Sequence, residues 1–439
     1  MLGKLYAKWM YAWETALTTR DTNRIVRPLE WGEDWLAGFV SSAGLGDGAS
    51  GVRGREAGSS APLRSGRNDN GGGDAGALRN DKQVAVDIDS GFERMVALNE
   101  EIVGRADEFF GYETPADFRL ELRHPLLFPT NVRPETLEQA AEYKRQAEVG
   151  EASPVEFLRF TSPVRTRYPE NDIVNARWYP APEPSAEKHA TDPKHPRRPK
   201  QAIIVMPQWN ADAFSHNALC TLFNRFGISA LRLSKPYHDI RRPAELERSD
   251  YAVSSNVGRT IEACQQAVVD IRSCIDWLES QGYEQFGVLG TSLGSLYAFI
   301  AAAFDPRIRV CAFNHASTWF GDVVWTGQST RHIRASFEQA GLSQNDVRKI
   351  FTSISPMSYM DRFAEHPKRV LVVHATYDLT FIRKFSLDVL ENFDRVGVDY
   401  VSKVLPCGHY TTGETPYQYI DGWYLGSFVY QAFKALREK

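Results

Sequence analysis

The sequence lacks the features that mark a membrane-spanning, a disulfide-bonded or a nucleic-acid-binding protein. No apolar run approaches the roughly 20 residues that cross a bilayer. Five cysteines are scattered over 439 residues, which excludes a disulfide scaffold and predicts a cytoplasmic protein with reduced thiols. The formal net charge of −4 shows no basic excess, so we expect no nucleic acid as a partner.

One stretch almost lacks bulky apolar residues, and it divides the chain. Residues 41–83 are dominated by Gly, Ser, Asn, Asp and Arg, which predicts a disordered insertion; Gly-rich nucleotide binding is disfavoured because no strand precedes it. Residues 1–40 are predicted to form a helical extension that docks on the body. Peripheral contact with a membrane through Trp9 and Trp13 is the alternative, and it is not expected. Residues 84–155 are predicted to be a helical segment packed on the core.

From residue 156 to 439 the chain alternates strands and helices, which predicts an α/β fold with a doubly wound, mostly parallel sheet. The predicted strands are 157–163, 175–179, 202–206, 228–233, 286–289, 308–313, 370–374 and 399–405, and the main helices are 89–110, 134–149, 212–226, 257–281 and 417–437. An aromatic-rich insertion at 317–363 falls where a lid would cover a site at the carboxyl ends of the strands. A helical excursion that only packs on the sheet edge is the alternative.

The most informative stretch is Gly290-Thr291-Ser292-Leu293-Gly294, between an apolar run and an Ala-rich helical segment. Strand, G-x-S-x-G and helix in this order are typical of a nucleophile elbow. The flanking glycines let strand and helix approach, the turn lifts the Ser292 hydroxyl above the sheet, and the Leu293 amide is left free to stabilise an oxyanion. A Gly-rich turn without chemistry is the alternative. A Walker-type phosphate loop is excluded, because no Lys-Ser/Thr pair follows Gly294.

A serine hydroxyl becomes a good nucleophile when an imidazole accepts its proton and a carboxylate orients that imidazole. On such an elbow the order along the chain is Ser, then acid, then His. Asp378 follows an apolar strand, and His409 follows the last one, with Gly408 expected to let the loop aim the ring. Taken singly, Asp378 could cap a helix near Phe381 and His409 could be a loop histidine. Jointly, the order favours a triad of Ser292, Asp378 and His409.

Other residues compete for these roles. His315 and His374 also follow strands, but neither comes after a suitable acid, and Asp361 lies in a helical stretch of the insertion. His189 and His195 lack metal-ligand spacing, so no metal site is expected.

The second oxyanion amide is expected from the loop after strand 202–206. That loop reads Pro207-Gln208-Trp209-Asn210, and it has no glycine where a hydrolase usually carries His-Gly. We assign the amide to Gln208 or Trp209.

Residues 157–439 resemble the α/β-hydrolase superfamily. The resemblance rests on the elbow at Gly290 to Gly294, on Asp378 and on His409. Leu-Arg-Leu-Ser-Lys-Pro-Tyr-His-Asp-Ile-Arg-Arg-Pro, from Leu231 to Pro243, is similar to a poorly characterised branch of α/β-hydrolase-domain proteins. The resemblance implies a serine hydrolase of ester or related acyl bonds that needs neither metal nor organic cofactor. Tyr237 and His238 of this segment either face the mouth of the site or serve the loop structurally.

We therefore predict a serine hydrolase that acts on a small-molecule ester with an apolar acyl or aromatic group, a preference taken from the aromatic-rich insertion. A peptidase or amidase with the same triad is one alternative. The other is a non-catalytic scaffold whose N-terminal extension and insertion bind protein or membrane. The sequence carries no signal for an oligomeric state.

Overall fold

A nine-stranded sheet forms the centre of the computed structural model, which describes residues 2–42, 77–130, 134–182 and 198–438. The strand order is β1-β2-β3-β5-β4-β6-β7-β8-β9. Strands β4 to β9 run parallel, and β1, β2 and β3 extend one edge in antiparallel fashion. The predicted doubly wound, mostly parallel sheet is therefore confirmed.

Eight of the strands lie at the predicted places, and β1 was not foreseen. The strands are β1 (Arg119–Arg123), β2 (Val155–Thr161), β3 (Ile173–Tyr179), β4 (Lys200–Met206), β5 (Ile228–Leu233), β6 (Tyr283–Thr291), β7 (Ile308–Asn314), β8 (Arg369–Ala375) and β9 (Tyr400–Leu405). The sequence of β1, Arg-Leu-Glu-Leu-Arg, is polar because this edge strand is mostly exposed. A polar edge strand carries no apolar run to reveal it.

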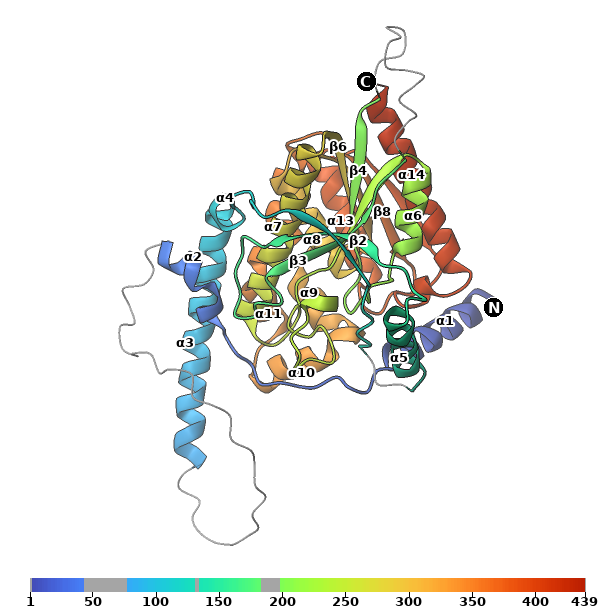
Figure 1. Cartoon of the computed structure of the whole chain (residues 1–439). Coiled ribbons are helices and arrows are strands. Elements are labelled where there is room, and N and C mark those ends of the chain that lie inside the picture. Colours follow the sequence, from blue (N-terminus) through green and yellow to red (C-terminus); the bar gives the residue numbers. More distant parts are fainter. Residues whose placement is uncertain (1, 43–76, 131–133, 183–197, 439) are drawn as a thin grey trace.

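Helices cover both faces of the sheet (Figure 1). One face carries α7 (Val257–Ser280), α8 (Leu293–Phe304) and α13 (Arg383–Val396), and the other carries α6 (Asn217–Arg225) and α14 (Tyr417–Arg437). Because successive side chains of a strand point to opposite faces of the sheet, each strand contributes residues to both apolar cores. In β4, for example, Ile204 belongs to the first apolar core, and Ile203 and Val205 belong to the second.

The remaining helices lie outside this sandwich. They are α1 (Leu2–Thr18), α2 (Ala37–Ser42), α3 (Ala77–Gly104), α4 (Ala106–Phe109), α5 (Pro134–Glu148), and, between β7 and β8, α9 (Phe320–Thr326), α10 (Arg331–Gln339), α11 (Gln344–Ile350) and α12 (Met360–Ala364). Among the described helices, none is both long and apolar enough to cross a membrane. All five cysteines are buried and free.

Two predicted boundaries are wrong. Most of the predicted insertion, residues 43–76, lies outside the described residues, but α3 begins at Ala77, so an insertion that extends to residue 83 ends too late. The good helix formers Ala77, Leu78 and Arg79 extend the helix toward its N-terminus. Likewise, α6 begins at Asn217 instead of residue 212, because the Asp212 carboxylate accepts backbone hydrogen bonds that hold a turn.

Candidate active site

The predicted elbow lies at the carboxyl end of β6, where Ser292 separates the strand from α8. Ser292 has φ 56° and ψ −119°, a conformation that residues with a side chain rarely adopt. A Cβ atom on Gly290 would lie 2.2 Å from the carbonyl oxygen of Gly294, and one on Gly294 would lie 2.2 Å from that of Met206. Crowding of strand, helix and the neighbouring β4 loop therefore requires both glycines, as the sequence predicted.

Three side chains from distant parts of the chain meet above this elbow. Nε2 of His409 lies 3.0 Å from Oγ of Ser292, and Nδ1 of His409 lies 3.0 Å from Oδ2 of Asp378. The His409 ring also stacks on Phe381, with 5.2 Å between ring centroids and 5° between planes. Ser292, Asp378 and His409 are thus connected by hydrogen bonds that can carry a proton from the hydroxyl to the imidazole.

Asp378 fulfils both interpretations that its position allowed. Its Oδ1 accepts hydrogen bonds from the backbone N–H groups of Thr380 and Phe381, as a capping residue would, and Oδ2 faces His409. Burial opposes ionisation of Asp378, but His409 and His315 beside it hold its pKa below the usual range. A fixed, ionised carboxylate can therefore orient the imidazole.

Electrostatics favour a positive charge on His409. Burial lowers the pKa of this imidazole, but the charge of Asp378, its hydrogen bond and the more remote charge of Glu14 together raise the pKa above its ordinary value. A raised pKa makes His409 a better proton acceptor for the Ser292 hydroxyl.

A second imidazole, that of His315, approaches the same carboxylate. His315 follows β7, and its Nδ1 lies 3.0 Å from Oδ2 of Asp378, at an ion-pair distance but without the angles of a hydrogen bond. Burial and the neighbouring His409 lower the pKa of His315, so this ring is neutral. Among the described residues, His315, Asp378 and His409 are also the group whose ligand atoms converge, within 4.8 Å, as a metal site would require. Oδ2 of Asp378 lies 3.0 Å from both rings but is hydrogen-bonded to His409 alone, so we interpret Asp378 as the partner of His409, with His315 packed beside the pair.

The expected oxyanion loop, which follows β4, is held by the segment after β5. Nζ of Lys235 donates to the Gln208 carbonyl at 2.8 Å, and the Trp209 indole N–H donates to the carbonyl of Ser249 at 2.9 Å. Leu293 is the first residue of α8, so its N–H has no acceptor within the helix and remains free for an oxyanion.

The hydrogen bonds of His238 distinguish between the two roles that its sequence position allowed, at the mouth of the site or in the structure of the loop. Its Nδ1 lies 2.8 Å from the Pro236 carbonyl oxygen, which can only accept, so Nδ1 carries the hydrogen and donates it. The unprotonated Nε2 therefore accepts the backbone N–H of Asn210 at 3.1 Å. His238 and Tyr237 are buried. The structural interpretation is therefore correct for His238: it supports the loop 207–210, which lacks glycine and is braced by side chains instead.

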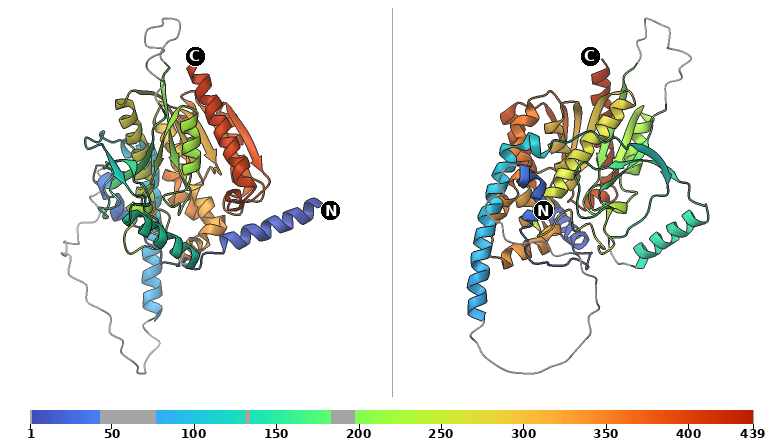
Figure 2. Two further views of the ribbon diagram at one scale, coloured as in Figure 1. Left: turned by 45° about the vertical axis from the view of Figure 1, so that its right-hand side comes forward. Right: turned by 60° about the vertical axis from the view of Figure 1, so that its left-hand side comes forward.

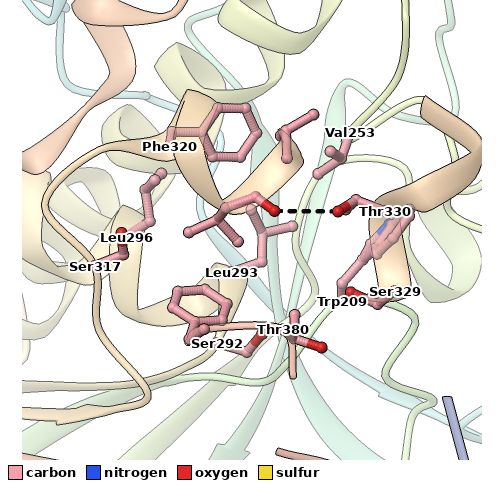
Figure 3. A pocket seen from close by; sticks show the side chains of 13 residues that line it. Trp209, Val253, Ser292, Leu293, Leu296, Ser317, Phe320, Ser329, Thr330 and Thr380 are labelled. Carbon is pink, nitrogen blue, oxygen red and sulfur yellow. Dashed lines mark hydrogen bonds between the residues drawn. The ribbon is translucent and has the colours of Figure 1, made fainter. Parts of the chain in front are cut away.

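An apolar pocket opens beside Ser292 (Figure 3). Its volume is about 490 Å³, including space open to solvent. The lining residues are Trp209, Val253, Ser292, Leu293, Leu296, Ser317, Phe320, Val323, Val324, Ser329, Thr330, Thr380 and Phe381. None of these described side chains carries a charge. One wall comes from the 317–363 insertion, so this insertion contributes to the pocket and does not merely pack on the sheet edge.

The remaining candidates lie elsewhere. His374 is buried at the end of β8, and burial lowers its pKa to about 4. Asp361 is exposed and pairs with Arg395, away from the pocket. His189 and His195 lie outside the described residues.

Sequence reasoning missed Glu14 of α1, whose carboxylate lies at the site. Its carboxylate is buried and accepts hydrogen bonds from the loop that carries His409. The one signal was a charged residue between Met10 and Thr18, at the spacing of the buried helix face. The structure also gives Gly408 a reason that the sequence did not reveal: a Cβ there would lie 2.3 Å from Oε2 of Glu14.

Among the comparisons with known proteins, a match to a family model agrees with this fold. A family model described as "Alpha/beta hydrolase domain containing 18" matches residues 190–358, which is less than half of the chain and ends before Asp378. Two Escherichia coli proteins, each described as "Uncharacterized 31.7 kDa protein in traX-finO intergenic region", are 34% and 33% identical over 106 residues. Each alignment covers 22% of this chain, which spans only 36% of the length of these relatives.

Solved structures with some likeness include an acylaminoacyl peptidase of Pyrococcus horikoshii (12% identity, TM-score 0.47, 64% of this chain and 46% of that chain). An esterase of Pyrococcus furiosus has 12% identity and a TM-score of 0.42, over 74% of this chain and 100% of that chain. Acetyl xylan esterase 1 of Thermoanaerobacterium sp. has 12% identity and a TM-score of 0.48, over 79% of this chain and 98% of that chain. Structural similarity at this level does not show that this chain shares the substrate or the mechanism of those proteins. The family match over residues 190–358, the strand order and the elbow agree with an α/β-hydrolase fold.

Proposed function

We propose that this protein is a serine hydrolase that cleaves carboxylic esters through a covalent acyl-enzyme. The observation that carries the proposal is the pair of 3.0 Å contacts that join Ser292 Oγ to His409 Nε2 and His409 Nδ1 to Asp378. The strained backbone of Ser292 adds support, because such conformations persist mainly where function requires them.

In the proposed mechanism, His409 Nε2 takes the proton of the Ser292 hydroxyl as Oγ attacks the ester carbonyl carbon. The oxyanion accepts hydrogen bonds from the N–H of Leu293 and from that of Gln208 or Trp209. His409 then returns its proton to the leaving alcohol, and the acyl group stays on Oγ. A water molecule, deprotonated by His409, releases the carboxylic acid and restores the serine.

The pocket supports an apolar acyl or aromatic group in the substrate. Val253, Leu296, Phe320 and Val324 line it, and burial of each methylene group against such side chains is worth about 0.8 kcal/mol. A peptidase that selects a charged peptide terminus would need a carboxylate or a basic group there. The absence of charge among the described lining residues therefore favours esters over such peptides.

The test is a kinetic comparison of p-nitrophenyl esters with aminoacyl anilides on the purified full chain, beside Ser292→Ala. We expect ester hydrolysis that falls by at least about a thousandfold in Ser292→Ala, because the nucleophile is gone. Faster turnover of the anilides would favour a peptidase. No turnover of either class, with wild type and Ser292→Ala indistinguishable, would favour a scaffold without catalytic activity.

A further inference from the structure

The loop that carries His409 is held by a carboxylate from the other end of the chain. Helix α1 contributes Glu14, whose side chain is fully buried. Its Oε1 accepts the N–H of Tyr410 at 2.8 Å, and its Oε2 accepts the N–H of Thr411 at 3.0 Å and the Thr411 hydroxyl at 3.1 Å. The Thr411 hydroxyl oxygen in turn accepts the N–H of Gly408 at 2.6 Å. Glu14 therefore fixes the backbone on both sides of His409.

The contacts of Glu14 suit an ionised carboxylate. All three groups that reach it are donors, and a protonated acid would present its own hydrogen to one of them. Burial raises the pKa of Glu14, and the N–H groups of Tyr410 and Thr411 oppose that rise. Among the described side chains, no lysine or arginine forms an ion pair with Glu14. The cation that it can compensate is the imidazolium that His409 becomes when it takes the serine proton.

Helix α1 also docks through groups that carry no charge. The Tyr6 hydroxyl donates to the carbonyl of Pro406 and lies 2.6 Å from the Tyr417 hydroxyl, and Met10 is buried in the core beneath α14. Figure 2 shows α1 against the body, with its N-terminal end projecting away. A substitution of Tyr6 changes the docking of α1 and keeps the charge of Glu14. The effects of docking and of charge can therefore be measured separately.

We propose that Glu14 is a positioning residue for His409: its carboxylate fixes the His409 loop and supplies, beside Asp378, a second negative charge that stabilises the imidazolium. The proposal extends the proposed function and rests on it. Other titratable groups around the pair are Asp378 and His315, from the loops after β8 and β7, and Cys407 and Tyr410 of the same loop. Arg24, Arg248 and Asp21 are charged groups that act on Tyr410.

The test measures the pKa of His409 directly, by NMR of histidine-labelled full-length protein assigned with His409→Gln. We expect Glu14→Gln to lower this pKa by about one unit, because a nearby opposite charge is lost. The acid limb of kcat/KM should move to lower pH with it, and the plateau should fall about tenfold. Glu14→Asp keeps the charge one methylene group away and should lie between wild type and Glu14→Gln. Tyr6→Phe, the docking control, should leave the pKa unchanged.

Two outcomes would overturn the proposal. One is an unchanged His409 pKa in folded Glu14→Gln, or in Glu14→Asp should Glu14→Gln not fold. The other is an equal shift in Tyr6→Phe, which would mean that helix docking alone matters. Because the NMR titration needs no turnover, it separates this proposal from the proposed function. A wild-type protein that does not hydrolyse esters would contradict the proposed function. The effect of Glu14 on the pKa of His409 could still be measured in that case.

Discussion

One oxygen of Asp378 faces two imidazoles, and this geometry governs the chemistry at the scale of single residues. His315 and His409 both place Nδ1 at 3.0 Å from Oδ2. Burial lowers the pKa of His315, so that ring carries no charge and does not neutralise the carboxylate. The negative charge of Asp378 therefore acts on His409, whose pKa lies above its ordinary value of about 6.5.

The first prediction concerns pH. His409 must be neutral to accept the serine proton, so kcat/KM should rise with pH through a midpoint above about 6.5. Asp378→Asn removes the charge that raises this pKa, so the midpoint should move to lower pH. The plateau of kcat should fall about ten-thousandfold, because the imidazole loses its orientation and tautomer. The matched control is Asp361→Asn, at the exposed Asp361–Arg395 ion pair, which should behave as wild type. An unmoved midpoint in Asp378→Asn would contradict this assignment.

The sequence revealed those residues that directly follow an apolar strand. Ser292, Asp378 and His409 each do so, and the order of their types carried the hypothesis. Glu14 lies on α1 and follows no strand. Lys235 follows β5, but its role was not foreseen, because its partner is a backbone carbonyl in a neighbouring loop. A hydrogen bond to a backbone carbonyl leaves no pattern in the residue types of either segment.

At the scale of elements, the loop after β4 compensates for its missing glycine with side chains from the segment after β5. Burial lowers the pKa of Lys235 far below its usual range, and its Nζ donates to the Gln208 carbonyl. His238 accepts the N–H of Asn210. The sequence similarity at 231–243 therefore marks a support for the proposed oxyanion loop, and the residues themselves need not touch the substrate.

The second prediction tests this support. Lys235→Met keeps the volume and removes the donor, so the loop should shift, and kcat should fall about tenfold with little change in KM. Lys368→Met is the matched control, because Lys368 is also buried and donates to the carbonyls of Phe363 and His366, away from the pocket. It should lower the unfolding temperature and leave kcat unchanged. Equal kcat losses in both variants would show only a general effect of losing a buried lysine.

The third prediction concerns the insertion between β7 and β8. Helix α9 lines the pocket with Phe320, whereas Trp325 of the same helix lies under Arg334 and does not line it. Phe320→Ala should enlarge the pocket and raise the ratio of kcat/KM for octanoate over butyrate esters about tenfold. Trp325→Ala should leave the ratio unchanged. A ratio that moves in Trp325→Ala and not in Phe320→Ala would place the acyl group elsewhere.

At the scale of the whole molecule, a fully buried ion pair joins three parts of the chain. Arg241 Nη1 lies 2.8 Å from Asp270 Oδ2 of α7, and neither side chain is exposed to solvent. Ser162, just after β2, donates to the other oxygen of Asp270, and Arg241 also donates to the carbonyls of Asn171 and Ser234. The antiparallel edge, the segment after β5 and α7 are therefore fixed to one another near the supporting residues of the loop 207–210.

The fourth prediction follows from this network. Asp270→Ala leaves the Arg241 guanidinium buried without its charge partner, and we expect a loss of about 3–5 kcal/mol in the free energy of unfolding. Urea denaturation followed by circular dichroism measures the change. Glu142→Ala, which breaks a solvent-exposed ion pair with Arg145 on α5, should leave the denaturation midpoint unchanged. Equal midpoints for wild type and Asp270→Ala would contradict a structural role of the buried pair.

The sheet could be predicted because most of its parallel strands are buried on both faces, and several of them contain continuous apolar runs, as in β4 and β8. The exposed β1 gave no such run. The packing of α1 against the His409 loop could not be read from either segment, because it depends on where the fold brings two distant ends of the chain.

Labelling of the purified full chain with a fluorophosphonate, followed by peptide mass spectrometry, tests most directly whether Ser292 is an activated nucleophile. We predict one adduct on Ser292 in the wild type, none in Ser292→Ala and strongly slowed labelling in His409→Ala. An unlabelled wild type, or an adduct that persists in Ser292→Ala, would contradict the proposed serine hydrolase.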